Sequence, residues 1–418
     1  MTCTARTRVA GGRYTAPCAS LVALLSAALL ASCTDLLTPD NPSEILAEDL
    51  KDPRALPILL AGVAGDYDYM YSYAIVTTGH FANELWHTGS QGGWRELNRG
   101  IADPQGQMGT VYDRAVKANW VADNAAALIH EAFPDARSKP ELARARIYAG
   151  FAQLMLADNF CAATINGGPA LAPTAMYREA LANFTDALAI TAAASQDTAR
   201  AKLAAVYRLQ ALAGRARANL MLELFQTARD DASQIPGNWR FQAIYSINSS
   251  REENFVPSHT VARFRKEGGV DPRFFEDPRY ASDPRLNFIN KGPAFKGEDR
   301  IRQFVEQTKY PERFSPANIA SSQEARLIEA EAELELGNTE RAIAIINQLR
   351  AAAALAPYAG PATRDDVLQQ IFFERSVELF LEARHLADLR RSASPLLDGR
   401  SDCGPISWVE QNTNPNLR

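Results

Sequence analysis

Residue types and motifs that many enzymes need are scarce in this 418-residue sequence. It contains five histidines and five cysteines. We find no GxSxG elbow, Walker loop, HExxH helix, GxGxxG turn or paired-cysteine metal motif. Glycosidase carboxylates have no fixed spacing, so these absences leave a surface hydrolase open as an alternative. The sequence favours a binding protein over an enzyme and predicts no cofactor.

An excess of basic residues is also lacking. The formal net charge is −5, and removal of residues 1–32, which hold three arginines and no acids, would make it −8. Nucleic acids select basic surfaces, so we do not expect nucleic acid as a partner. The remaining chain of about 385 residues is long enough for one large domain or two coupled ones.

Long apolar runs are absent after the first 32 residues, so no transmembrane helix is predicted. Leu21–Leu30 is apolar but too short to cross a bilayer, and three arginines precede it. Leu30-Ala31-Ser32-Cys33 matches a bacterial lipobox, in which the cysteine is diacylated. The alternative is an ordinary signal peptide with an incidental cysteine. We predict a lipoprotein signal peptide over 1–32, lipidation (palmitate) at Cys33 and a tether over 33–50, which would hold the protein on a membrane.

Two cysteines, Cys161 and Cys403, remain outside these N-terminal segments. An oxidising compartment would permit a disulfide that ties the first helical region to the C-terminal tail. The alternative is two unpaired residues, and the sequence does not decide because the geometry of a bridge cannot be read from it.

Alanine and larger apolar residues recur at helical spacing through about residues 50–234. This spacing predicts helices over 52–66, 111–130, 142–158, 176–190, 198–213 and 216–232. The segment Ala325–Ala354 resembles a tetratricopeptide repeat, with Gly337 at a tight helix end and Thr339 capping the second helix. Helix hairpins stacked as a solenoid are the expected architecture. Four glutamates of this repeat alternate in sequence and are predicted at the surface: Glu329, Glu331, Glu333 and Glu335.

Phe372–Arg391 is predicted to be one helix with a wide apolar face. Its charged residues are spaced for ion pairs from Arg375 to Glu378 and from Arg384 to Asp388. Taken alone, this pattern is typical of a solvated charged face.

The same segment resembles the C-terminal signature of the SusD/RagB family. The matching residues are Glu374-Arg375, Glu378-Leu379, Glu382, Asp388-Leu389 and Arg390, whereas Ala383 replaces the usual Gly and His385 the usual Arg. The resemblance implies an all-α fold of tetratricopeptide-like helix-hairpin repeats, the SusD-like superhelix, with a long irregular insertion. It also implies an outer-membrane, surface-exposed lipoprotein that captures a nutrient, often a glycan, for a SusC-like TonB-dependent transporter. A peptide ligand and a repeat scaffold for outer-membrane protein assembly remain alternatives.

Two stretches, 67–109 and 236–320, break the helical pattern and are predicted to be loop-rich. They carry aromatic residues, whose flat faces stack on sugar rings, among polar residues that can bond hydroxyl groups. The candidate ligand residues are Trp86, Trp94, Tyr69, Tyr71, Trp239 and Tyr245. The alternative is that these rings pack in the core. If Trp86 and Trp94 bind sugar, alanine at either position should reduce affinity and leave the melting temperature nearly unchanged.

Two smaller patterns lie in these stretches. His80, Glu84 and His87 would share one face of a helix and could hold a divalent metal. Without an HExxH motif a structural role is favoured, and no metal is predicted. Asp-Pro-Arg recurs at Asp271, Asp277 and Asp283 and predicts three turns.

These predictions divide the chain after the tether into a helical region at 51–235 and a loop-rich segment at 236–320. C-terminal repeat helices at 321–400 and a tail at 401–418 complete it.

Overall fold

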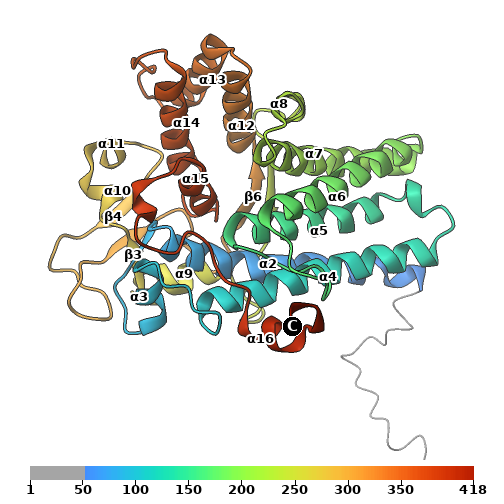
Figure 1. The fold of residues 1–418 in the computed structure, drawn as a ribbon, viewed down its shortest axis with the longest axis horizontal. Coiled ribbons are helices and arrows are strands. Elements are labelled where there is room, and N and C mark those ends of the chain that lie inside the picture. The colour runs from blue at the N-terminus through green and yellow to red at the C-terminus, as the bar shows by residue number, and fades with distance from the viewer. Residues whose placement is uncertain (1–51) are drawn as a thin grey trace, which may run out of the picture. The chain divides into compact units, whose positions relative to one another are not determined.

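This computed structural model describes residues 52–418. A short 3-10 turn (Pro53–Ala55) leads into a long central helix, α2 (Leu56–Phe81) (Figure 1). The predicted lipidation site Cys33 lies outside the described residues. From Tyr67 onward α2 is covered by protein on nearly every side. The prediction of a loop beginning at residue 67 is therefore wrong. A helix buried all round has no polar face, so its sequence lacks the periodicity on which the helix predictions depended.

Antiparallel helices follow, and each packs against its neighbour in the chain (Figure 1). They are α4 (Gln107–Ala132), α5 (Pro140–Asn159), α6 (Pro173–Ala194), α7 (Thr198–Met221) and α8 (Phe225–Ala232). The predicted helix hairpins are confirmed.

One predicted boundary in this region is wrong. The sequence placed a break at residues 214–215, but α7 continues through Gly214 and ends at Met221. A Cβ at Gly214 would lie 2.2 Å from the ring of Phe184 on α6. This glycine therefore allows two helices to approach closely, and the chain turns only at Glu223, where φ is +59°.

The C-terminal repeat consists of α12 (Ser322–Glu335) and α13 (Thr339–Ala352). Gly337 joins them with φ +87°, which confirms the predicted tight helix end. Thr339 is the first residue of α13 and does not cap it, because Asn338 occupies the cap position.

The segment Phe372–Arg391 is two helices and not one. α14 (Arg364–Glu378) ends before the non-helical stretch 379–384, and α15 (His385–Arg391) follows. Side chains from elsewhere bond this stretch: the Leu381 amide donates to Glu84 (2.8 Å) and the Tyr310 hydroxyl donates to the Leu381 carbonyl (2.9 Å). Leu381 and Ala383 have φ of +53° and +57°. The family's usual glycine at position 383 fits this conformation.

Most charged residues of the signature are buried, and only Glu378 and Arg390 are partly exposed, so the predictions of a solvated face and of local ion pairs are wrong. Arg375 pairs with Asp388 (2.9 Å), and Arg384 donates to the Ile319 carbonyl (2.8 Å). Glu329, Glu331 and Glu333 are also less than a tenth exposed. Arginines on other segments form ion pairs with these glutamates, for example Arg391 with Glu331. Alternation in sequence does not separate a surface glutamate from one that faces a partner on the next helix.

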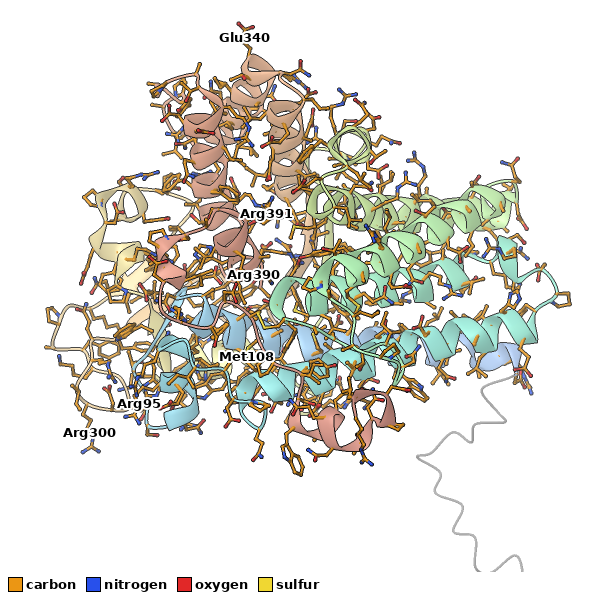
Figure 2. All side chains as sticks on the ribbon, viewed as in Figure 1. Arg95, Met108, Arg300, Glu340, Arg390 and Arg391 are labelled. Carbon is orange, nitrogen blue, oxygen red and sulfur yellow. A yellow bond between two sulfur atoms is a disulfide. The ribbon has the colours of Figure 1, made fainter. Side chains whose placement is uncertain are left out.

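Three two-stranded antiparallel ladders organise the loop-rich segments. They pair β1 (Leu85–His87) with β3 (Gly268–Val270), β2 (Arg240–Ala243) with β6 (Ala317–Ser321), and β4 (Phe288–Asn290) with β5 (Val305–Gln307). Short helices lie between them: α3 (Gly92–Asn98), α9 (Phe255–Thr260), α10 (Arg273–Glu276) and α11 (Pro278–Ala281). Figure 2 shows Arg300 at the tip of this loop-rich part and Glu340 at the far tip of the C-terminal hairpin.

The three Asp-Pro-Arg turns are confirmed. Each aspartate accepts a hydrogen bond from the amide two residues ahead, at 3.0 Å for Asp271, 2.9 Å for Asp277 and 3.0 Å for Asp283.

Cys161 and Cys403 form a disulfide, the bridged alternative of the two left open by the sequence. It holds the tail, which carries α16 (Trp408–Thr413), beside the end of α5, where the Cys161 amide donates to the Gly404 carbonyl. No helix within residues 52–418 combines the length and apolar character needed to span a membrane.

Candidate functional site

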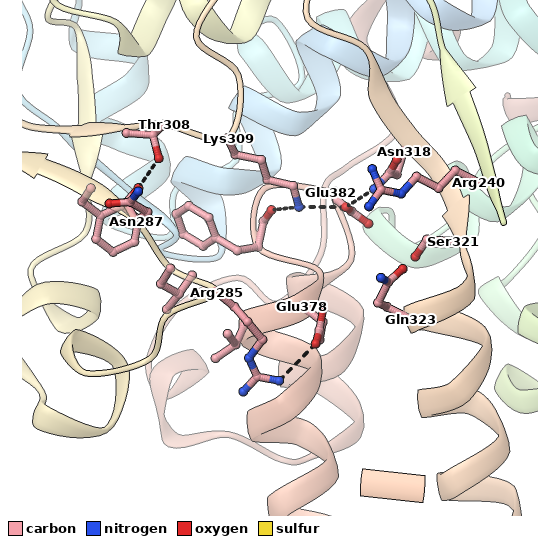
Figure 3. Close-up of a pocket in the computed structure, with 14 residues that line it drawn as sticks. Arg240, Arg285, Asn287, Thr308, Lys309, Asn318, Ser321, Gln323, Glu378 and Glu382 are labelled. Atoms are coloured by element: carbon pink, nitrogen blue, oxygen red, sulfur yellow. Dashed lines mark hydrogen bonds and ion pairs between the residues drawn. The ribbon is translucent and has the colours of Figure 1, made fainter. Parts of the chain in front are cut away.

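A polar pocket of about 260 Å³ lies where β2, β6 and the start of α12 meet the end of α14 (Figure 3). Segments far apart in the sequence therefore build it. Leu286, Phe288, Val377 and Phe380 give it some apolar wall. Its polar lining is larger: Arg240, Arg285, Asn287, Thr308, Lys309, Asn318, Ser321, Gln323, Glu378 and Glu382.

Lys309 and Glu382 form the centre of the pocket (Figure 3). The Lys309 ammonium donates to the Phe380 carbonyl and to Glu382 Oε1, both at 2.7 Å. The Asn318 amide donates to the same Glu382 oxygen at 3.1 Å. Glu382 Oε2 accepts no hydrogen bond from any described residue, so it is available to a donor on a ligand.

The lower wall depends on Arg285. The Asp283 turn positions this arginine, whose guanidinium pairs with Asp283 (2.6 Å), Glu374 (2.5 Å) and Glu378 (3.1 Å). Burial raises the pKa of Glu378, and Arg285 opposes that rise. The third Asp-Pro-Arg turn therefore also supplies a side chain of the pocket, which its turn geometry alone did not predict.

Tyr71 supports the pocket from behind. Its hydroxyl donates to the Asn318 carbonyl at 2.5 Å and lies 3.0 Å from the Glu382 carbonyl. Because the Tyr71 side chain is fully buried, it cannot contact a ligand as predicted. Its contribution is to fix the backbone of two pocket residues.

Trp94 and Tyr245 are also core residues, which corrects two further predictions. Trp94 is 2% exposed, and the rings of His259 (4.6 Å), His80 (5.3 Å) and Tyr73 (5.9 Å) surround it. Tyr245 is 6% exposed, and its hydroxyl donates to the Asp68 carbonyl. The Trp94 ring is enclosed by other rings, and Tyr245 presents only its small exposed fraction to a pocket that Tyr69 also lines.

The other three predicted aromatic residues are partly exposed but do not line the polar pocket. The guanidinium of Arg302 lies 6.0 Å from the Trp86 ring centroid. Tyr69 lines a separate pocket of about 290 Å³, and Arg114 lies 4.1 Å from its ring centroid. Trp239 directly precedes Arg240, a residue of the polar pocket. The predicted loop-rich segment 236–320 supplies eight of the fourteen lining residues, and the segment 67–109 supplies none. Sequence reasoning missed the polar side chains of the pocket, since no aromatic pattern marks them.

His80, Glu84 and His87 do not converge on one point. His80 Nε2 lies 2.8 Å from His259 Nε2, Glu84 accepts from the Leu381 amide, and His87 lies 3.6 Å from Glu267. Burial lowers the pKa of His80 to about 3. Over residues 52–418, no three histidine, cysteine or carboxylate side chains are placed to hold a metal ion.

Known structures share this fold. A SusD-like carbohydrate binding protein from Bacteroides vulgatus has a TM-score of 0.63 at 17% identity, covering 81% of this chain and 83% of its own. A SusD superfamily protein from Parabacteroides distasonis has a TM-score of 0.67 at 14% identity, covering 90% and 99%. A SusD superfamily protein from Bacteroides vulgatus gives 0.65 at 16%, covering 88% and 98%. This chain therefore has the same fold as these structures.

The sequence points the same way. Residues 324–415, which contain the C-terminal signature, match the model of the SusD family. The resemblance noted from the C-terminal signature is therefore confirmed. No curated protein sequence matches the chain.

Proposed function

We propose that this protein is a lipid-anchored outer-membrane protein that binds a nutrient and delivers it to a SusC-like TonB-dependent transporter. The observation that carries the proposal is the polar pocket on a SusD-type scaffold. Free acceptors such as Glu382 Oε2 lie in it beside donors such as Arg240 and Gln323. Sugar hydroxyl groups both donate and accept, so they complement such a mixture. The carbohydrate-binding relative from Bacteroides vulgatus supports an oligosaccharide ligand.

The proposed mechanism is binding and handover, without covalent chemistry. Lys309 and Asn318 hold Glu382 in place, and Arg285 holds Glu378, so the ligand meets side chains that are already oriented. Phe288 and Phe380, with ring centroids 5.6 Å apart, add an apolar wall beside these groups. The lipid at Cys33 would keep the protein at the cell surface beside the transporter, which would supply the energy for import.

A surface hydrolase is the alternative that the pocket itself raises, because Glu378 and Glu382 both line it. Each carboxylate already has a cationic partner, Arg285 for Glu378 and Lys309 for Glu382. We therefore assign them to ligand binding. Release of shorter sugars from a bound oligosaccharide, with loss of release in Glu378→Gln, would reverse that assignment.

The first test is a pull-down of the membrane-anchored protein from its native outer membrane, with the co-purifying chains identified. We expect a large β-barrel transporter at equal stoichiometry. Recovery of the protein alone, or with the barrel-assembly machinery, would contradict the uptake function and favour the repeat-scaffold alternative.

Ligand binding is tested separately by calorimetry with a panel of oligosaccharides. Glu382→Gln keeps the size of the side chain but removes its negative charge. Affinity should fall about tenfold, since the hydrogen bonds from ligand hydroxyl groups to residue 382 are then no longer charge-assisted. Arg178→Gln is the matched control, because Arg178 is exposed on α6 and lines none of the pockets described above. Equal affinities for both variants would show that the ligand does not bind in the polar pocket.

A further inference from the structure

We infer that the polar pocket selects an acidic oligosaccharide, with Arg240 binding a carboxylate of a uronic acid residue. This inference rests on the proposed function and names the class of ligand that the pocket would take.

Arg240 is the one charged residue of the pocket that lacks a partner within the described chain. Lys309 is compensated by Glu382, and Arg285 by three carboxylates. The Arg240 guanidinium takes part in no ion pair or side-chain hydrogen bond with any residue from 52 to 418, although its backbone pairs with Ser321 in the ladder of β2 and β6. Figure 3 shows its side chain reaching into the pocket on the side of Asn318 and Ser321. A guanidinium in this position presents a fork of N–H donors that matches a carboxylate.

The start of α12 lies on the same side of the pocket. Ser321 caps this 14-residue helix by accepting from the Glu324 amide, and the Ser322 amide donates to the Trp239 carbonyl. The intervening Gln323 amide has no acceptor in the described residues, and Gln323 lines the pocket. A free amide at a helix start favours negative charge, so it adds to the Arg240 guanidinium. The Glu324 side chain does not line the pocket and instead pairs with Arg217.

A second cavity of about 300 Å³ adjoins the pocket and shares Arg285, Gln323 and Glu378 with it. A ligand of several units could therefore bind at Arg240 and continue past Gln323 toward Arg326. This arrangement fits an oligomer better than a single sugar.

The lining favours a sugar acid over a peptide carboxylate. Ten of the fourteen residues around the pocket are polar, and they offer hydrogen bonds on several sides. Peptide side chains would need apolar subsites, whereas the hydroxyl groups of a pyranose ring match this pattern of donors and acceptors.

The test is calorimetry on the full-length lipoprotein with uronic acid oligosaccharides, namely oligogalacturonate, oligomannuronate and oligoglucuronate, each paired with its methyl ester. The ester keeps the sugar backbone and removes the charge. We expect at least one acid to bind about tenfold tighter than its ester, as one charge-assisted contact would give. Its affinity should fall as salt is raised, because Arg240 is exposed.

In Arg240→Gln the acid and the ester should bind alike, while Arg178→Gln should keep the wild-type difference. Neutral oligosaccharides that bind wild type and Arg240→Gln equally, with no preference for any acid, would overturn this inference and leave the proposed function standing. Failure of every oligosaccharide to bind would overturn both. Preference for short peptides with a free over an amidated C-terminus would show that the carboxylate belongs to a peptide and refute the sugar assignment.

Discussion

A buried ion pair between Arg217 on α7 and Glu324 on α12 joins the N-terminal helices to the C-terminal repeat. Two guanidinium nitrogens of Arg217 donate to the two oxygens of Glu324, at 2.6 and 2.5 Å, and both side chains are about 96–97% buried. Arg384 adds a second cation, with its Nε 3.6 Å from Glu324. Glu324 therefore lies beside two buried arginines, of which Arg384 also lies 4.0 Å from Asp158.

Glu324→Gln should destabilise the fold strongly. The substitution preserves the shape of the side chain but leaves Arg217 and Arg384 without that negative charge. Removal of one partner from a buried pair costs about 3–5 kcal/mol, because the remaining charge is desolvated and uncompensated. We expect a loss of that size in the free energy of unfolding, measured by urea denaturation with the disulfide intact.

Glu335→Gln is the control, since Glu335 pairs with an exposed arginine, Arg364. That variant should lose less than about 1 kcal/mol. The double variant Arg217→Leu/Glu324→Leu should recover part of the loss, because apolar residues can replace a buried pair at little cost. A loss below about 1 kcal/mol for Glu324→Gln would show that the pair does not hold the two helical regions together.

The pH dependence gives an independent check. Burial by itself opposes ionisation of Glu324, but Arg217 and Arg384 outweigh it and lower the pKa of this carboxyl. A lowered pKa in the folded state contributes stability above the ordinary glutamate pKa of 4.5, and this contribution disappears as the pH falls through the folded-state pKa. Wild type should therefore lose stability below about pH 4.5 more steeply than Glu324→Gln.

Three further substitutions test other features of the structure. Burial raises the pKa of Asp68 to about 7, so wild type should lose stability as the pH rises from 4 to 8, and Asp68→Asn should be the more stable at pH 8 by up to about 4 kcal/mol in denaturant titrations. Equal pH profiles would refute this. Trp94→Ala should lower the free energy of unfolding by about 3–5 kcal/mol, since the ring is enclosed. An unchanged melting temperature would show that Trp94 is not a core residue and would favour a role in ligand binding. Ala383→Gly should raise stability by up to about 1 kcal/mol by relieving the left-handed backbone, and a marked loss would mean that the buried methyl group matters more.

The features that could be predicted from the sequence are those with local physical causes. The hairpin of α12 and α13 depends on a helical period and on a glycine at its turn, and both are visible in the sequence. The three Asp-Pro-Arg turns depend on a side chain that bonds its own backbone two residues ahead. The disulfide remained open because its partners lie 242 residues apart in sequence.

The errors came from elements that are buried on all sides. The tyrosines of α2 lie in a helix that is covered on nearly every side, so their sequence shows no polar face and does not predict a helix. The local sequence predicts a surface position for Glu331, since its partner, Arg391, lies 60 residues away.

The non-helical stretch between α14 and α15 explains both the limit of the sequence prediction and the origin of the pocket. Local periodicity favours a continuous helix here, but Tyr71, Glu84, Lys309 and Tyr310 bond the backbone of residues 380–382. If the helix continued, these buried groups would lose their partners, and such a loss costs about 1–3 kcal/mol for each group. The break therefore follows from tertiary hydrogen bonds. It also brings Phe380 and Glu382 into the polar pocket, so the structural feature that sequence reasoning missed is the one that builds the candidate site.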